Sequence, residues 1–208
     1  VGGTGLYVNS LIYGIEFNSI EIDEEYRKEL DKRAEKEGLD SLYNEAKKID
    51  PEAIKNISKN DKKRIIRILE IYKQTGKTKT EQEIESRKNG VKYDYKVFAI
   101  NMDREVLYER INKRVDIMIE QGLIQEVENL VKKYKEFPTA MQGLGYKEVV
   151  QFINGELTKE EMIEKIKQET RRYSKRQITW FKKNKDTIWL DGLDTKQNNI
   201  NIILEEIK

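Results

Sequence analysis

Segments with helical periodicity, most of them closed by a single glycine, run through the chain and constrain its fold more than any other feature. Apolar residues recur at the three- and four-residue spacing of amphipathic helices. Glycines end such segments at positions 14, 38, 76, 122 and 155. Only two prolines occur in 208 residues. The sequence therefore predicts a mostly helical protein.

The stretch from about residue 20 to residue 90 has almost no strand pattern. Its spacing predicts helices over 24–37, 41–49, 51–57, 62–74 and 80–87. Asp50-Pro51 and Asp61 are good helix starts, because aspartate caps the first turn and proline fits inside it. We expect an inserted all-helical domain over 21–90, between residues 1–20 and 91–208.

The rest of the chain mixes helices with two strand candidates. Residues 95–101 alternate β-branched and aromatic side chains and predict the clearest strand, and 187–190 predicts a second, shorter one. Helices are expected over 6–13, 103–121, 123–134, 146–153, 159–183 and 199–207. Thr158 and Glu161 form a capping box for the longest of them.

Composition excludes several kinds of chemistry. The chain has no cysteine and no histidine, so it offers neither a thiolate nucleophile nor the commonest general base and metal ligand. The net charge of +2 gives no global argument for nucleic-acid binding. No apolar run approaches the roughly 20 residues of a membrane span, and no signal peptide is visible. We expect a cytoplasmic protein.

Basic residues dominate the end of the longest predicted helix. Nine lysines and arginines and one acidic residue lie between positions 165 and 185. A helical projection places Met162, Ile163, Ile166, Thr170, Tyr173, Trp180 and Phe181 on one side. It places Lys165, Arg171, Arg172, Lys175, Arg176, Lys182 and Lys183 on the other. This basic face is either a solvated surface or a ridge for nucleic-acid phosphates, and the scarcity of acids favours the ridge.

Two further groups of basic residues suggest anion binding. Lys62, Lys63, Arg64 and Arg67 lie on one predicted helix; they either solvate it or grip RNA. Arg110 and Arg114 lie one turn apart beside an apolar stripe. A guanidinium near a core needs an anionic partner. That partner is either a carboxylate such as Glu126 or a diphosphate, which suits the forked donors of arginine.

Two glycine-rich turns precede helices. Gly2-Gly3-Thr4-Gly5 can aim backbone N–H groups and the Thr4 hydroxyl at an anion, although a tight strand-to-helix turn explains it equally well. Gln142-Gly143-Leu144-Gly145-Tyr146-Lys147 lets the backbone approach a partner and presents an aromatic ring. Each turn alone is a weak signal.

Taken in order, these motifs resemble the tRNA dimethylallyltransferase (tRNA isopentenyltransferase) family. The resemblance covers essentially the whole chain. It rests on Gly2–Tyr7, on Asp50–Ala53 followed by Asn60-Asp61, and on Arg110/Arg114 with Met118, Gly122-Leu123 and Glu126-Val127. It continues through Gly145–Glu148, Thr170-Arg171 and Lys175–Phe181.

The resemblance implies a P-loop NTPase-like α/β core, partial in this chain, with the inserted helical domain. It implies transfer of a dimethylallyl group from dimethylallyl diphosphate to the N6 amine of the adenosine 3′-adjacent to the anticodon, flipped into a channel. Mg²⁺ would bind through the diphosphate and a segment outside this sequence. Thr4 would line the channel, and Arg110 and Arg114 would stabilise the leaving group.

The resemblance also implies the tRNA contacts. It places three groups of residues on the RNA: Lys63, Arg64, Ile65, Ile66 and Arg67; Gln142, Gly143, Leu144, Gly145, Tyr146 and Lys147; and Arg171, Arg172, Lys175, Arg176 and Gln177. We expect a monomer whose partners are tRNA and dimethylallyl diphosphate, with no membrane.

The family's P-loop and its catalytic acidic residue precede the Gly-Gly-Thr-Gly motif, and this sequence begins with Val1, directly before that motif. We therefore expect the 208 residues alone to be inactive. Two alternatives stay open: a non-catalytic helical RNA-binding module, and an enzyme that prenylates a free adenine nucleotide. The second is disfavoured because a free nucleotide needs no basic ridge.

Overall fold

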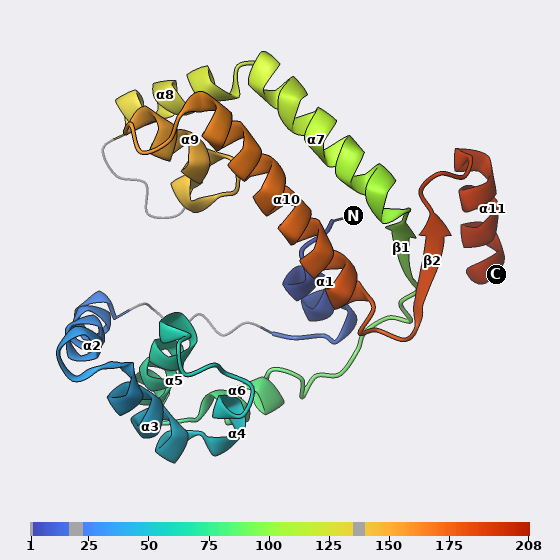
Figure 1. Cartoon of the computed structure of the whole chain (residues 1–208). Coiled ribbons are helices and arrows are strands. Elements are labelled where there is room, and N and C mark those ends of the chain that lie inside the picture. The colour runs from blue at the N-terminus through green and yellow to red at the C-terminus, as the bar shows by residue number, and fades with distance from the viewer. Residues whose placement is uncertain (1, 17–22, 135–139) are drawn as a thin grey trace. The chain divides into compact units, whose positions relative to one another are not determined.

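The computed structural model describes residues 2–16, 23–134 and 140–208, which belong to two compact units. One unit comprises Val1–Gly5 with Tyr95–Lys208, and the other comprises Leu6–Asp94 (Figure 1). The domain boundaries expected from the sequence are 20/21, which lies outside the described residues, and 90/91. None of the described helices is long and apolar enough to cross a membrane.

The Leu6–Asp94 unit is built from helices. They are α1 (Gly5–Ile12, which begins at the unit boundary), α2 (Glu24–Glu37), α3 (Leu39–Ile49), α4 (Pro51–Ile54), α5 (Lys62–Thr75) and α6 (Lys79–Glu85). Its core joins α2, α3, α4 and α5 through Leu30, Leu42, Ala46, Ile54, Ile65, Ile66, Ile68 and Leu69. The prediction of a helix over 51–57 was too long. The chain turns after Ile54 because it must reach Asp61, which caps α5 by accepting from the Arg64 N–H at 3.1 Å.

The two ends of this helical unit lie against each other. The Glu16 N–H donates to the Ser86 carbonyl at 2.9 Å, and the Asn89 side chain donates to the Glu16 carboxylate at 2.8 Å. Gly14 has φ +59°, and a Cβ there would lie 2.2 Å from the Gly90 carbonyl oxygen. Only glycine therefore fits at Gly14, where the two ends meet.

The Tyr95–Lys208 part of the other unit contains a helical bundle and a small sheet. Its helices are α7 (Arg104–Glu120), α8 (Leu123–Lys133), the short 3₁₀ helix η1 (Ala140–Gln142), α9 (Tyr146–Ile153), α10 (Lys159–Phe181) and α11 (Lys196–Glu206). The buried core of the bundle consists of Val115, Leu123, Val127, Met141, Val149, Met162 and Ile166. It draws on α7, α8, α9 and α10.

The sheet consists of β1 (Val97–Asn101) and β2 (Thr187–Asp191), which pair in parallel with Val97 opposite Thr187. Both strands occur where the sequence predicts them. The chain leaves β1 into α7 and returns through α10 into β2, so the bundle lies within the crossover (Figure 1). Parallel strands require such a long connection.

Helix starts with clear sequence signals are confirmed. The Asp103 carboxylate accepts from the Glu105 N–H at 2.8 Å and caps α7. Thr158 and Glu161 form the predicted capping box of α10, with the Glu161 carboxylate accepting from the Thr158 N–H at 2.8 Å. These starts were predictable because each involves groups within three residues along the chain.

Candidate functional site

The Gly2–Gly5 segment lies on the C-terminal half of α10. The Gln177 side-chain amide donates to the Gly3 carbonyl oxygen at 2.9 Å. A Cβ at Gly3 would lie 2.0 Å from Gln177 Nε2, and a Cβ at Gly5 would lie 2.2 Å from the Trp180 ring. The two glycines thus permit an approach that no other residue could make without displacing α10 side chains. Thr4, between them, is exposed.

Gln177 therefore has a different place from the one expected. The resemblance places it among the tRNA contacts, whereas the structure shows it half-buried, with one N–H of its side-chain amide donating to the Gly3 carbonyl. Trp180 was expected to pack, and it does so against a glycine of the motif. The sequence signal for this contact is the absence of a side chain at Gly3 and Gly5.

Arg110 and Arg114 lie on α7 and are exposed. The α7 residues that bind α10 are Asn112, which accepts from Arg171 at 2.6 Å, and Asp116, which accepts from Lys167 at 2.7 Å. Arg110 and Arg114 are each two residues from Asn112, about 200° around the helix. Their guanidinium groups therefore point away from α10.

The expected carboxylate partner of Arg114 is not present. Glu126 accepts a hydrogen bond from the Tyr146 hydroxyl, which raises the pKa of Tyr146, first through that bond and then through burial. Within the part of the chain that the structure describes, neither Arg110 nor Arg114 forms an ion pair. Both are free to bind an anion, and the prediction that they face a diphosphate remains open.

The basic face of α10 is narrower than the projection suggests. Lys165 donates to Gln151 of α9 at 2.9 Å, and half-buried Arg171 reaches Asn112 of α7. Tyr173, projected onto the packed side, is 40% exposed. The projection failed here because α7 and α9 approach α10 from two different directions, which the sequence of α10 does not reveal.

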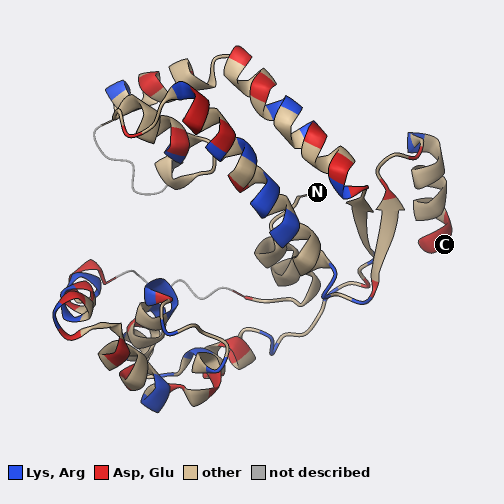
Figure 2. Cartoon of the chain, in the orientation of Figure 1, with Lys and Arg blue, Asp and Glu red and all other residues tan. Residues whose placement is uncertain are grey.

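Five exposed basic residues remain at the C-terminal end of α10 and just beyond it: Arg172, Lys175, Arg176, Lys182 and Lys183. Figure 2 shows acidic residues in the N-terminal half of α10, whereas the charged residues in its last two turns, Lys175 and Arg176, are both basic. Arg172 pairs with Glu169 at 2.5 Å, and the Arg176 guanidinium lies 5.7 Å from the centre of the Tyr173 ring. This set is called the α10 basic patch below.

The Gln142–Lys147 turn divides into an exposed and a buried part. Gln142, Gly143, Leu144 and Lys147 are exposed. Gly145 is buried with φ +95°, and its N–H donates to the buried Glu148 carboxylate at 2.8 Å. Gly145 is thus held at the start of α9 and the Tyr146 hydroxyl binds Glu126 of α8, while the other four residues present the surface of the turn.

The Lys63–Arg67 cluster on α5 is also only partly a surface. Ile65 and Ile66 are 0% and 5% exposed and belong to the core of the helical unit, so their side chains offer no surface to tRNA. Lys63 and Arg64 are exposed and Arg67 is half-buried. The range taken from the resemblance spans one full helical turn and so necessarily includes the packed side.

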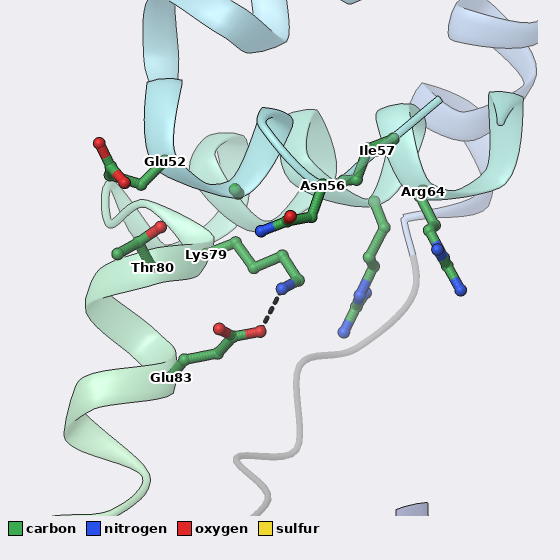
Figure 3. A pocket seen from close by; sticks show the side chains of 9 residues that line it. Glu52, Asn56, Ile57, Arg64, Lys79, Thr80 and Glu83 are labelled. Carbon is green, nitrogen blue, oxygen red and sulfur yellow. Dashed lines mark hydrogen bonds and ion pairs between the residues drawn. The ribbon is translucent and has the colours of Figure 1, made fainter. Parts of the chain in front are cut away.

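Arg64 and Arg67 line a pocket of about 400 Å³ together with residues of α4, α6 and the turn after α4 (Figure 3). Lys79 is paired with Glu83. Arg67 lies 3.5 Å from Glu70, whose carboxylate is already held by Arg27 at 2.6 and 2.9 Å, and Arg64 lies 3.3 Å from Asp61. These long secondary contacts leave most donors of both pocket guanidiniums available.

Asp50 binds Thr80 and Ala53, two of the residues that line this pocket. It is 2% exposed and caps α4 by accepting from the Ala53 N–H at 2.9 Å. It also accepts from the Thr80 N–H at 2.8 Å and the Thr80 hydroxyl at 2.7 Å. Burial opposes ionisation of Asp50, but the bonds from Thr80 and Ala53 outweigh it and lower its pKa. One carboxylate thus fixes the starts of both α4 and α6.

The described residues do not form a protein-only metal site. Nowhere among them do three histidine, cysteine, aspartate or glutamate side chains gather closely enough to hold a metal ion.

A comparison with known protein families assigns the chain to one family. The sequence profile described as IPP transferase matches residues 1–184. The chain belongs to the IPP transferase family. A curated relative in Acetivibrio thermocellus, named tRNA dimethylallyltransferase, is 48% identical over 191 residues, which is 91% of this chain and 61% of the relative.

Solved structures agree with this assignment. The full-length tRNA isopentenylpyrophosphate transferase of Bacillus halodurans matches with a TM-score of 0.61 and 36% identity, over 98% of this chain and 63% of that one. A eukaryotic dimethylallyltransferase acting on tRNA matches with a TM-score of 0.70 and 31% identity, over 100% of this chain and 54% of that one. The predicted fold class, a partial P-loop NTPase-like core with an inserted helical domain, is confirmed. The chain spans about 60% of the length of such relatives.

Proposed function

We propose that the protein to which this chain belongs transfers a dimethylallyl group from dimethylallyl diphosphate to N6 of the adenosine 3′-adjacent to the anticodon of tRNA. The observation that carries the proposal is the 48% identity over 191 residues to a relative named tRNA dimethylallyltransferase. In this reaction the bond between C1 of the dimethylallyl group and the diphosphate oxygen breaks. A bond from C1 to N6 forms, and N6 loses a proton.

Arg110 and Arg114 are assigned to the diphosphate. Their exposure and their lack of ion pairs among the described residues support this role, because a diphosphate would supply the missing anion. Negative charge grows on the leaving group in the transition state, so guanidinium groups held beside it lower the barrier. Thr4 is assigned to the channel for the target base, since it is exposed between two glycines held against α10.

The tRNA surface comprises the residues of the three clusters that the structure leaves on the outside. They are Lys63, Arg64 and Arg67 on α5, Gln142, Gly143, Leu144 and Lys147 at the turn before α9, and the α10 basic patch. Mg²⁺ would enter bound to the diphosphate and offset its charge. The protein is proposed to act as a monomer in the cytoplasm, where its tRNA substrate lies.

The test is prenyl transfer to unmodified tRNA by the protein extended to the length of its relatives. Arg114→Ala should lower kcat/KM by about 10²–10³-fold and leave the tRNA dissociation constant unchanged. The matched control is Lys113→Ala, which removes an exposed cation one position away on α7. The 208 residues alone should transfer no prenyl group, and detectable transfer would contradict that expectation.

The same measurements separate the alternatives. A non-catalytic RNA-binding module would show no transfer at any length, and Arg114→Ala would then change neither binding nor chemistry. An enzyme acting on a free adenine nucleotide would lose all tRNA binding to competing nucleotide.

Salt dependence tests the RNA surface independently of chemistry. Each phosphate contact contributes a slope of about 0.7 to 0.9 to the fall of log affinity with log salt. Removing both Lys175 and Arg176 should therefore reduce the slope by about 1.4 to 1.8. If the double substitution leaves the slope unchanged, the α10 basic patch does not contact the RNA.

A further inference from the structure

Two side chains of α10 hold the Gly2–Gly5 segment in place. Gln177 binds the Gly3 carbonyl oxygen at 2.9 Å, and the Trp180 ring lies where a Cβ at Gly5 would fall, at 2.2 Å. Gln177 and Trp180 are three residues apart and so lie within about 60° of each other on the helix. They form one contact surface, one turn long, under the segment that carries Thr4.

The same turn of α10 carries part of the basic patch on another side. Lys175 is two residues from Gln177, about 200° around the helix, and Arg176 is about 100° away. Both are exposed. An α-helical turn is rigid because its backbone groups are bonded to one another. A nucleic acid bound by Lys175 and Arg176 therefore lies on the same helical turn as the residues that hold the Gly2–Gly5 segment.

We propose that Gln177 and Trp180 are positioning residues for Thr4. Through them, one turn of α10 joins the tRNA-binding surface to the channel-lining segment. This inference rests on the proposed function for the role of Thr4. The geometry of the contact stands independently of it.

The two contacts differ in how they would respond to change. The Gln177 amide is the end of a flexible side chain, so loss of its donor frees the Gly3 carbonyl without moving α10. The Trp180 indole is rigid and close to the helix, so a methyl group at Gly5 must displace the segment itself. Gln177→Met removes the donor and keeps the length and the charge of the side chain. Gly5→Ala disturbs the second contact, between Gly5 and the Trp180 ring.

The experiment compares Gln177→Met and Gly5→Ala with Lys175→Ala in the protein extended to the length of its relatives. Both positioning variants should lower kcat by about 10- to 100-fold, because small misplacements near the reacting groups are costly. The tRNA dissociation constant should stay within about twofold. Hydrogen exchange at the amides of residues 4–6 should become faster. Lys175→Ala should give the reverse pattern, with weaker tRNA binding and unchanged exchange at residues 4–6.

The exchange measurement separates the inference from the proposed function. Faster exchange in Gln177→Met, in a protein that transfers no prenyl group, would support the contact and refute the function. If Gln177→Met weakens tRNA binding as much as Lys175→Ala and leaves the exchange unchanged, Gln177 is an RNA contact and the inference is wrong. Melting curves of both positioning variants are the control for folding. If Gln177→Met does not fold, Gly5→Ala still tests whether the contact with α10 positions Thr4.

Discussion

Asp50 provides the sharpest test of how the helical unit is built. Its buried carboxylate accepts three hydrogen bonds, from the Ala53 N–H and from the N–H and hydroxyl of Thr80, at 2.7 to 2.9 Å. Asp50→Ala removes all three acceptors at once. It leaves the first turn of α4 without a cap and releases the start of α6, which is 30 residues away in sequence.

The expected loss of stability in Asp50→Ala follows from these contacts. Loss of the α4 cap costs about 1 kcal/mol, and the two bonds from Thr80 to a charged acceptor are each worth about 1.5 kcal/mol. The variant also avoids the desolvation of a buried carboxylate, which offsets part of this sum. We expect a net loss of about 3 kcal/mol in the free energy of unfolding. That is a large fraction of the 5–15 kcal/mol typical of a domain.

The assay is urea unfolding at neutral pH followed by circular dichroism, with linear extrapolation to water. Asp40→Ala is the matched control, since it removes an exposed carboxylate from the first turn of α3 and should cost less than about 1 kcal/mol. Thr80→Val should cost about 1 kcal/mol, and its effect should largely disappear in the Asp50→Ala background. A loss below about 1 kcal/mol for Asp50→Ala, or full additivity with Thr80→Val, would refute the reasoning.

Three other changes should be measurable by the same unfolding assay. Ile65→Ala should lower the free energy of unfolding by about 2–5 kcal/mol, because Ile65 is fully buried. A loss under about 0.5 kcal/mol would mean that Ile65 is exposed and not part of the core. Arg27→Met should lose about 3 kcal/mol by leaving the buried Glu70 carboxylate without its bidentate partner, and an unchanged midpoint would contradict that. The lowered pKa of Asp50 gives stability that is present above its unfolded value of about 3.9 and is lost as the pH falls through the folded value. The acid unfolding curve of Asp50→Asn should therefore be shallower than that of the wild type, and identical curves would exclude this carboxyl as the source.

Local signals in the sequence predicted most of the secondary structure. The helices at Glu24–Glu37 and Tyr146–Ile153 have the predicted bounds, and Asp103 and Thr158 cap the helices expected of them. Each of these depends on residues within one or two turns of chain. The end of α4 was misplaced because it depends on where the following turn must lead.

The candidate site was harder to predict because its contacts join distant parts of the chain. Gln177 and Gly3 are 174 residues apart, so no spacing in the sequence links them. The direction of Arg171 and Lys165 depends on which helices flank α10, and a helical projection of α10 alone contains no such information. Ile65 and Ile66 were misplaced for a different reason. They lie on the packed side of α5, and only the range carried over from the resemblance placed them on the RNA.

The close pairing of residues 14–16 with 86–90 affects the folding of the whole chain. Closing a loop costs entropy that grows with the logarithm of its length. The helical unit joins its own ends, so the loop that the other unit must close has an effective length of roughly ten residues instead of nearly ninety. This lowers the entropic cost of closing that loop by about 2 kcal/mol. The helical unit could therefore lengthen or shorten over evolutionary time between Glu16 and Ser86 without changing the folding cost of the part that carries α7 and α10.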